Sequence, residues 1–339
     1  MEQIVKKNAG LDISMDTFWA TITLLNVDYE IKHVKSKDFK NNEKGFKEME
    51  QWQKDVCPEL QECHYTMEAI GVYYEPIAYY LFLQGYTVHV VLPNKAKKFA
   101  ESLDIKSKTD KLDSKALGRL GVERKLRDWQ PSEPIYKELK ELTRERGRLI
   151  KICTQFKNNL HALNHNYQPN KKSLKRLNSL INLMGKHILA IENEFKEKAK
   201  QDIKIKAKLD ILTSIPGIGE VTAIIVMAET NGFALMQNSR QLCSYAGLDV
   251  RECESGKWKG KSKISKKGNS HIRAALYFPA LTSIKYSTQN KLFYERIIKE
   301  KKKSKIGITA VSRKLLVLMY SLWKNDTMYI DNYQSIKAA

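Results

Sequence analysis

The sequence predicts an α/β domain, a helical hairpin and a mainly α-helical domain, in that order. Short β-type segments alternate with helical ones over the first 125 or so residues, and an apolar heptad pattern begins at Leu139. A turn containing proline and glycine at residues 214–219 then joins two apolar segments. With 339 residues the chain is long enough for two compact domains and a connecting element. We place the domains at residues 1–130, 131–208 and 209–330.

Three short strand candidates with tight polar breaks open the first domain and indicate an antiparallel meander. A helix with Phe46, Met49 and Trp52 near helical spacing follows, and strand and helix candidates then alternate. This is the element order of the ribonuclease-H-like fold. The expected elements are strands at 9–14, 18–25 and 29–34, a helix at 43–54, a strand at 63–68, a helix at 74–85, and a strand at 87–92 that Pro93 closes.

The second domain is predicted from apolar residues at alternating steps of three and four. The stripe runs from 139 to 163, breaks at 169–170, and resumes from 177 to 212 with one polar lapse. We expect an antiparallel coiled-coil hairpin that separates the two other domains and offers a dimerisation surface. An ordinary intramolecular helix pair is the alternative.

The third domain opens with Leu212-Thr-Ser-Ile-Pro-Gly-Ile-Gly219, followed by an apolar helix at 221–228. A helix, a Pro-Gly-Ile-Gly turn and a second helix describe a helix-hairpin-helix unit. Gly217 and Gly219 would let backbone N–H groups approach a nucleic-acid phosphate at a helix N-terminus. A purely structural helical turn is the alternative.

The charge of the chain predicts its partner. With 59 Lys and Arg against 38 Asp and Glu, the formal net charge is +21 and is spread over the whole length. Such a charge favours nucleic acid over acidic proteins or neutral metabolites, although ribosomal and membrane-surface proteins share it.

The cellular compartment of the protein is predicted from two features that the sequence lacks, a membrane-spanning stretch and a signal-peptide core. No stretch approaches the roughly 20 apolar residues of a membrane span, and residues 1–7 are charged and contain no signal-peptide core. The five cysteines are odd in number and form no CxxC pair, which favours free thiols over disulfides or a zinc site. We expect a cytoplasmic, nucleoid-associated protein.

Four carboxylates are candidates for a metal site. Asp12 lies among apolar residues of the first strand, where an isolated buried charge is costly unless it is paired, protonated or metal-bound. Glu68 ends another strand, and Asp110 and Asp113 share one face at a helix start. Converging carboxylates would repel one another unless Mg²⁺ or Mn²⁺ neutralised them, as in two-metal phosphoryl-transfer sites.

Two of these residues also have a simpler explanation. Asp110 could cap its helix, and Asp113 could pair with a nearby surface cation. Glu68 is the hardest to explain structurally, because it follows a run of core-type residues. Asp16 and Asp104 are weaker candidates, since both are expected in turns.

Ser255 is a candidate nucleophile, between Glu254 and Gly256 in a cationic loop. A serine beside glycine is accessible, and lysines could stabilise a phosphorane-like transition state. A loop that only contacts DNA is the alternative. The candidate nucleic-acid-binding cations of this region are Lys257, Lys259, Lys261, Lys263, Lys266, Lys267 and Arg273.

Taken together, the motifs resemble a known family. Gly-Leu-Asp-Ile-Ser from residue 10, Glu-Ala-Ile-Gly-Val-Tyr from 68 and Lys-Thr-Asp-Lys-Leu-Asp from 108 resemble the RuvC-like domain of DEDD transposases. Ser-Ile-Pro-Gly-Ile-Gly from 214, Tyr-Ala-Gly-Leu from 245, Glu-Ser-Gly from 254 and Ile-Ser-Lys-Lys-Gly-Asn from 264 look like their transposase domain. This is the IS110 (one-ten) group of insertion-sequence recombinases, and the resemblance covers about residue 8 to about 320.

The resemblance implies a site-specific DNA recombinase that moves its own insertion sequence. Asp12, Glu68, Asp110 and Asp113 would then hold Mg²⁺ or Mn²⁺, and Ser255 would form a covalent phosphoserine. It further implies donor and target DNA as partners, a structured noncoding guide RNA, and a homodimer or homotetramer.

The chain departs from the family pattern at two places. Ser114 stands where alanine commonly follows the last aspartate, and Asp249-Val250 replaces a Thr-Pro or Val-Pro pair. Neither change removes a reacting group. Two alternatives remain: a RuvC-like junction endonuclease in which water is the nucleophile, and a non-catalytic architectural DNA-binding protein.

Overall fold

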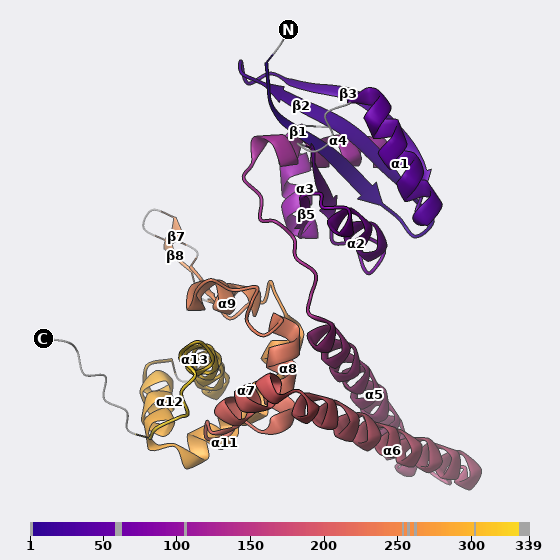
Figure 1. Ribbon diagram of the computed structural model, residues 1–339. Helices are drawn as coiled ribbons and strands as arrows, with labels where there is room; N and C mark the ends of the chain where they lie inside the picture. Colours follow the sequence, from indigo (N-terminus) through magenta and orange to yellow (C-terminus); the bar gives the residue numbers. More distant parts are fainter. Residues whose placement is uncertain are drawn as a thin grey trace, which may run out of the picture. The chain divides into compact units, whose positions relative to one another are not determined.

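The chain divides into two compact units, Met1–Pro131 and Ser132–Ala339 (Figure 1). Each unit has its own hydrophobic core. Within the described residues, the four cysteines Cys57, Cys63, Cys153 and Cys243 are free, as predicted, and Cys253 lies outside them. The computed structural model describes residues 3–57, 63–104, 107–252, 254–255, 258–260, 263–301 and 303–331.

The first unit contains a mixed five-stranded sheet in the order β3-β2-β1-β4-β5. β1, β2 and β3 are antiparallel, whereas β4 runs parallel to both β1 and β5. The predicted α/β class and all five strands are therefore confirmed. The strands are β1 (Ile4–Ile13), β2 (Thr17–Asn26), β3 (Ile31–Lys40), β4 (Cys63–Glu68) and β5 (Val88–Val91).

The first strand is longer than the sequence indicated, because its early polar residues have partners inside the fold. Lys6 Nζ donates to the backbone oxygens of Gly121 at 2.6 Å and Arg124 at 3.1 Å. Asn8 is fully buried and its Nδ2 donates to Thr66 Oγ1 at 2.9 Å. These polar residues break the apolar alternation that would identify a strand in the sequence.

One face of the sheet is apolar and is covered by helices α1 (Glu43–Val56) and α2 (Glu75–Leu83). Alternate residues of β1, such as Leu11, pack there against Phe46, Met49 and Trp52 of α1. Those three residues are buried, as their helical spacing predicted. Asn42 caps α1, since its side chain accepts from Gly45 N at 3.0 Å.

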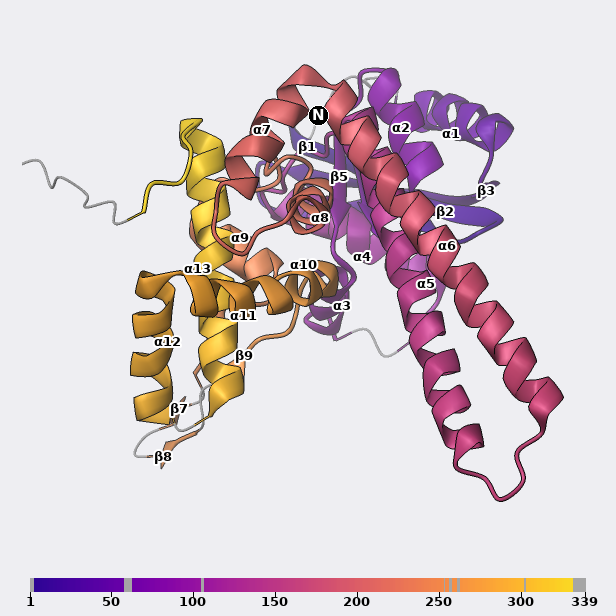
Figure 2. The same ribbon diagram turned by 90° about the horizontal axis from the view of Figure 1, so that it is seen from below.

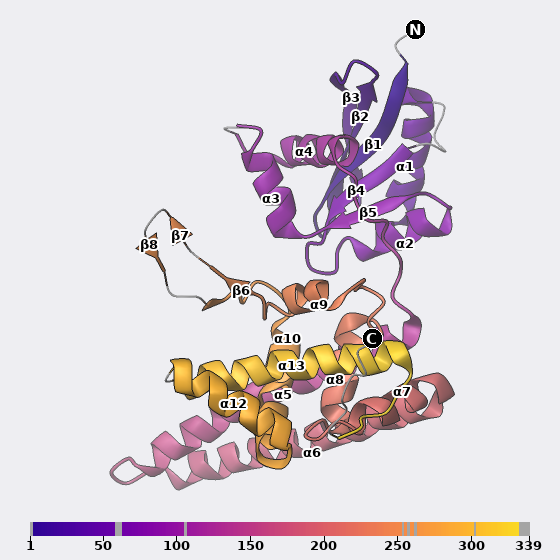
Figure 3. The same cartoon turned by 90° about the vertical axis from the view of Figure 1, so that its left-hand side faces the viewer.

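The opposite face is polar and receives α4 (Asp110–Glu123), which Figure 3 shows on the other side of the sheet from α1. Gly10 in β1 and Gly118 in α4 allow the close approach. A Cβ on Gly10 would lie 2.1 Å from Gly118 N, and one on Gly118 would lie 2.4 Å from Thr23 Oγ1. The helix therefore rests on the strand backbones.

Helix α3 (Pro93–Glu101) was not predicted from the sequence. The sequence pattern indicates Pro93 only as the end of the preceding strand, but this proline occupies the first turn of α3. Proline is well suited to that position, because its missing N–H has no intrahelical partner there. Val91, Ala96, Leu117 and Leu120 form a small separate core between α3 and α4.

The second unit begins with two long antiparallel helices, α5 (Pro134–Asn164) and α6 (Lys171–Gln201), which lie side by side in Figure 2. Ion pairs Lys198–Glu138 and Arg146–Glu192 fix their register. The predicted helical hairpin is therefore present. Its base enters the core of the unit, where Leu139 and Phe195 are fully buried.

The remaining helices of the second unit surround that core. Among the described residues, one helix, α13 (Ser304–Asn325), is long and apolar enough to cross a membrane, with a mean hydropathy of 1.3. Its Val311, Leu315 and Met319 are nevertheless fully buried in the core. The helices are α7 (Ile203–Thr213), α8 (Glu220–Thr230), α9 (Ser239–Tyr245), α10 (Ser270–Ala275), α11 (Tyr277–Tyr286), α12 (Thr288–Lys301) and α13 (Ser304–Asn325).

We predict that Gly10→Ala lowers the free energy of unfolding by about 1–3 kcal/mol, the usual cost of overpacking. The added methyl group meets helix backbone, which cannot move aside as a flexible side chain would. Denaturant unfolding followed by circular dichroism measures the change.

Gly147→Ala in α5 is the matched control, because nothing lies within 4 Å of its Cβ position. Alanine there should be neutral or stabilising by up to about 1 kcal/mol. Equal stability of Gly10→Ala and the wild type would contradict the close packing of α4.

Candidate active site

Asp12 and Glu68 lie at neighbouring positions on two adjacent parallel strands. Leu11 of β1 pairs with Met67 of β4, and Asp12 and Glu68 are the next residues along each strand. Both side chains are half-buried. Asp12 is the penultimate residue of β1, nearer the strand end than the sequence indicated.

Helix α4 presents the two other carboxylates. Thr109 caps this helix, because its Oγ1 accepts from Leu112 N at 3.2 Å, so Asp110 is not the cap. Asp110 and Asp113 occupy the first turn, with Asp110 exposed and Asp113 half-buried. The partial positive charge of a helix N-terminus favours carboxylates there.

The four carboxylates are close enough to influence one another. Burial, followed by the charge of Asp113, raises the pKa of Asp12 to about 7. Asp110 and Glu68 act in the same direction, and Lys108 opposes them. Burial and Asp113 also raise the pKa of Glu68. The raised pKa favours the protonated form of Asp12, so a proton and a cation would compete for this carboxylate.

Lys108 is a site residue that the sequence reasoning missed. Its positive charge lowers the pKa of both Asp12 and Glu68, against the larger effects of burial and of Asp113. It stands at the start of the quoted Lys-Thr-Asp-Lys-Leu-Asp segment. A lysine two residues before a carboxylate was the available signal.

The donor set suits a hard divalent cation. All four side chains supply carboxylate oxygens, the ligands that Mg²⁺ and Mn²⁺ prefer. Burial and the charges of the neighbouring carboxylates both raise the pKa of Asp12, and a bound cation would relieve the repulsion among these carboxylates. In the described part of the chain no three such groups lie at metal-ligand separation. The carboxylates thus share a region but do not form a closed ligand shell.

Ser114, one of the two departures from the family pattern, has a structural role. It is fully buried, and its Oγ lies 2.7 Å from Thr21 Oγ1 of β2. It also donates to Lys111 O at 2.9 Å. The hydroxyl links the first turn of α4 to the sheet and so helps to hold Asp113 in place.

Ser255 lies in the other unit, on a two-stranded arm that extends beyond α9 in Figure 3. β6 (Val250–Arg251) and β9 (Lys263–Ile264) form the stem, and β7 (Glu254–Ser255) pairs with β8 (Trp258–Lys259). Ser255 is exposed, as predicted for an accessible hydroxyl. At the second departure from the family pattern, Asp249 accepts a hydrogen bond from Ser265 Oγ and Val250 begins the stem.

The base of the arm is held by a buried carboxylate that the sequence reasoning missed. Glu229 of α8 is 1% exposed and accepts hydrogen bonds from Arg144 Nε at 2.8 Å and from Arg144 Nη2 at 2.9 Å. Asn269 Nδ2 donates to the same carboxylate at 2.7 Å, and Tyr245 OH donates to Glu229 O at 2.9 Å. The apolar helix that the sequence predicts at 221–228 ends just before Glu229, so nothing in the pattern indicates a buried ion pair.

The charge of Glu229 is stabilised by these partners. Burial alone would raise its pKa, but the hydrogen bonds from Arg144 and Asn269 outweigh burial and lower the pKa. Asn269 also caps α10, since its Oδ1 accepts from His271 N at 2.9 Å. One asparagine therefore joins the returning end of the arm to α8 and α10.

The predicted nucleic-acid-binding cations have different positions. Lys263, Lys266 and Lys267 are exposed on the arm, whereas Arg273 donates to Ala246 O at 2.8 Å and to Gly268 O at 3.2 Å. Arg273 thus contributes to the structure of the arm base. Lys259 lies in β8, and Lys257 and Lys261 lie outside the described residues.

The two candidate phosphate-binding glycines differ in accessibility. Gly217 has φ of +95° in a turn closed by Ile218 N donating to Ile215 O at 3.0 Å, and a Cβ there would lie 2.7 Å from Pro279 O. That glycine is required by the turn and by packing. Gly219 has open space around it and precedes α8.

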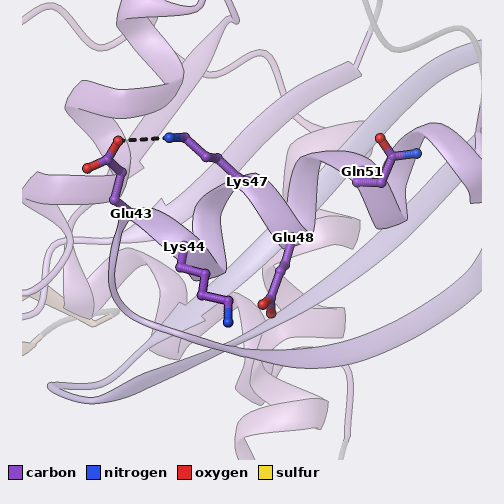
Figure 4. A pocket seen from close by; sticks show the side chains of 5 residues that line it. All are labelled: Glu43, Lys44, Lys47, Glu48 and Gln51. Carbon is purple, nitrogen blue, oxygen red and sulfur yellow. Dashed lines mark hydrogen bonds and ion pairs between the residues drawn. The ribbon is translucent and has the colours of Figure 1, made fainter.

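A separate hollow of about 630 Å³ lies along α1 and is shown in Figure 4. Its lining comes only from α1, and Lys47 and Glu43 in it form an ion pair at 3.0 Å. All of its residues belong to one exposed helix face, so it has no converging groups for chemistry.

Comparison with known proteins agrees with this arrangement. Residues 9–169 match the model of the IS110-type DEDD transposase domain, described as "Transposase". Residues 209–295 match the model described as "Transposase IS116/IS110/IS902 family". The first match contains all four carboxylates, and the second contains Ser255.

Curated relatives cover most of the chain. A "Pilin gene-inverting protein" of Moraxella bovis is 27% identical over 95% of this chain and 97% of its own length, and that of Moraxella lacunata gives the same values. The "Transposase for insertion sequence element IS1111A" of Coxiella burnetii is 22% identical over 72% of this chain and 73% of its own length. The chain is an enzyme acting on DNA and belongs to the IS110 family of transposases and recombinases.

Proposed function

We propose that the protein cuts and exchanges DNA strands through a metal-dependent carboxylate site and a covalent phosphoserine. The observation that carries the proposal is the clustering of Asp12 with Glu68, Asp110 and Asp113, because burial together with the three neighbouring carboxylates raises the pKa of Asp12 to about 7. Carboxylates placed at such electrostatic cost are typical of a functional site.

The ribonuclease-H-like, specifically RuvC-like, nature of the first unit belongs to this proposal. Three antiparallel strands followed by alternating helices and strands support it. The helix-hairpin-helix assignment is supported by the turn between α7 and α8 and by the open position of Gly219. We also propose three domains, in which the α5–α6 hairpin, within residues 131–208, is separate from residues 209–330.

The four carboxylates would hold Mg²⁺ or Mn²⁺, which when bound would polarise the scissile phosphate and stabilise the leaving oxygen. Ser255 Oγ forms a bond to phosphorus while one phosphorus–oxygen bond to the sugar breaks. The serine proton passes to a base or to water, and the leaving sugar oxygen takes up a proton. The phosphoserine conserves the bond energy for joining to another strand.

The relatives' names support recombination at defined sites. One relative is named for inverting a pilin gene and another for transposing an insertion sequence, and by this proposal the present chain rejoins the strands that it cuts. A covalent protein–DNA bond would achieve this without a second energy source. By this proposal the substrates are donor and target DNA, and the protein works at the nucleoid in the cytoplasm.

Guidance by a structured noncoding RNA is the part of the proposal that accounts for sequence specificity. The chain has a formal charge of +21 but no recognisable motif for reading bases. Base pairing would then supply specificity, while the protein contacts backbone and shape.

A homodimer or homotetramer would bring together two or more copies of the carboxylate-bearing unit and of the unit that carries Ser255. The outer part of the α5–α6 hairpin supports this, because Leu180 and Leu183 are 40% and 51% exposed and lie one turn apart. Exposed leucines on a long hairpin suit a coiled-coil contact with a second copy.

A junction endonuclease that uses water remains a second candidate. It is favoured by one observation: all four carboxylates belong to the first unit, whereas Ser255 belongs to the second. A covalent adduct with DNA distinguishes the two.

Asp12→Asn or Asp113→Asn should reduce strand cleavage by about 100-fold or more, because several kcal/mol of metal-dependent stabilisation are lost. Nucleic-acid affinity should stay near that of the wild type, since the basic surface is unchanged. Asp16→Asn, an exposed aspartate in a turn, is the control. Cleavage by both site variants at the wild-type rate would refute the carboxylate site.

Ser255→Ala should remove both the covalent adduct and strand exchange, measured by denaturing gel and by recombinant product. Ser270→Ala, an exposed serine at the start of α10, should leave both intact. Recombination by Ser255→Ala protein would exclude the nucleophile role.

If one subunit supplies the serine and another the carboxylates, mixing Ser255→Ala with Asp12→Asn should restore activity. About a quarter of the sites would be complete in randomly formed dimers. If the wild type forms the covalent adduct but mixing restores no activity, the sharing of sites between subunits is refuted and the nucleophile role of Ser255 is not.

The double variant Leu180→Asp, Leu183→Asp should lower the sedimentation coefficient by breaking the oligomer, because it places charges in an apolar contact. Leu189→Asp is the matched control, since this leucine is 59% exposed on a different face of the same helix. If the wild type, the double variant and the Leu189→Asp control all sediment alike, the hairpin is only an intramolecular spacer.

A further inference from the structure

A pocket of about 410 Å³ opens directly beside the carboxylates, between α3 and α4. Glu68 and Asp113 form part of its wall, so the pocket and the candidate metal site share two residues. The volume falls within the usual range for pockets that hold small organic groups, about 300–1,000 Å³.

The inner wall of this pocket is apolar. Phe99 and Ala100 of α3 are half-buried and face Leu117 and Leu120 of α4, which are almost fully buried. Part of the Phe99 ring therefore packs on the small core between the helices, and the rest is open to a ligand. A flat aromatic or heterocyclic group would complete this wall.

The outer part of the pocket is polar and cationic. Lys97 and Lys108 are exposed there, together with Asn94 and Ser107. Lys97 makes only a 3.8 Å ion pair with Glu101, and Lys108 already influences the carboxylates. A ligand with a flat apolar body and a phosphate at its edge matches both parts.

The position of the pocket limits what this ligand can be. Trp19 of β2 pairs with Asp12 on one side of the site, and Lys111 Nζ lies 5.9 Å from its ring. The pocket borders the other side, toward Glu68 on β4. A nucleic-acid strand whose phosphate lies at the carboxylates would have its neighbouring nucleoside at this opening.

We propose that the pocket between α3 and α4 receives the unstacked base of the nucleotide next to the scissile phosphate. The inference rests on the proposed function and adds a requirement to it. The strand must be unpaired at this nucleotide when it is cut, because a paired base cannot enter. Stacking on Phe99 tolerates any base, so the pocket selects strand structure more than sequence.

The test uses forked DNA that carries the end of the element encoding this chain. 5-Iododeoxyuridine replaces single nucleotides on either side of the cleavage point, with Ca²⁺ in place of Mg²⁺ so that the DNA stays intact. Ultraviolet crosslinks are mapped by mass spectrometry. One position should crosslink to α3, at or next to Phe99.

Two variants that each introduce a phenylalanine ring distinguish the pocket from the rest of the surface. Ala100→Phe fills the pocket and should reduce that crosslink and the cleavage rate by about tenfold or more. Gln51→Phe adds the same ring on the exposed face of α1 and should change neither. An abasic nucleotide at the crosslinking position should make the wild type and Ala100→Phe cleave at similar rates.

Crosslinks confined to other segments would overturn the proposal. So would an Ala100→Phe defect that persists in full on every abasic substrate, because the substitution would then impair cleavage in some way other than by excluding a base. Crosslinking needs no cleavage. A wild type that crosslinks at α3 but never cleaves in Mg²⁺ would therefore contradict the proposed chemistry and leave the base pocket supported.

Discussion

The close contact between α4 and β1 is the constraint on which the candidate site depends. Two glycines, Gly10 and Gly118, leave no side chain between helix and strand, and Ser114 links the helix start to the sheet through Thr21. Helix α4 can then present the aspartates of its first turn beside Asp12. A methyl group on Gly10 would lie 2.1 Å from Gly118 N, so the helix would have to shift away from the strand.

The second unit uses a different device for a similar purpose. The arm that carries Ser255 is a short two-stranded ribbon, which has little stability of its own. Its base is fixed by Asn269, which bonds to the buried ion pair of Glu229 and Arg144. Such a network is favourable only when all its members are present, so it specifies one geometry for the arm base.

Placing the carboxylates and the serine on separate units has a chemical consequence. Neither unit alone holds both halves of the proposed reaction, and so cleavage would depend on how the units and their copies assemble. A pocket for an unpaired base would add a second condition, since duplex DNA could not fill it. Both conditions would limit cleavage to assembled complexes on unpaired DNA, although the basic charge of the chain favours binding to DNA of any sequence.

The sequence by itself determined the α/β order and the helical hairpin, because periodicity, strand ends and helix starts are local properties. It also singled out the four carboxylates, whose metal-binding role is a proposal. It could not reveal α3, since Pro93 ends one element and begins another, or the roles of Lys108 and Glu229. Asp12 and Asp113 are distant in sequence, and only the packing of α4 on β1 makes their charges interact. Burial and long-range contacts determine pKa values and the shape of a pocket, and neither burial nor such contacts can be predicted from the local sequence pattern.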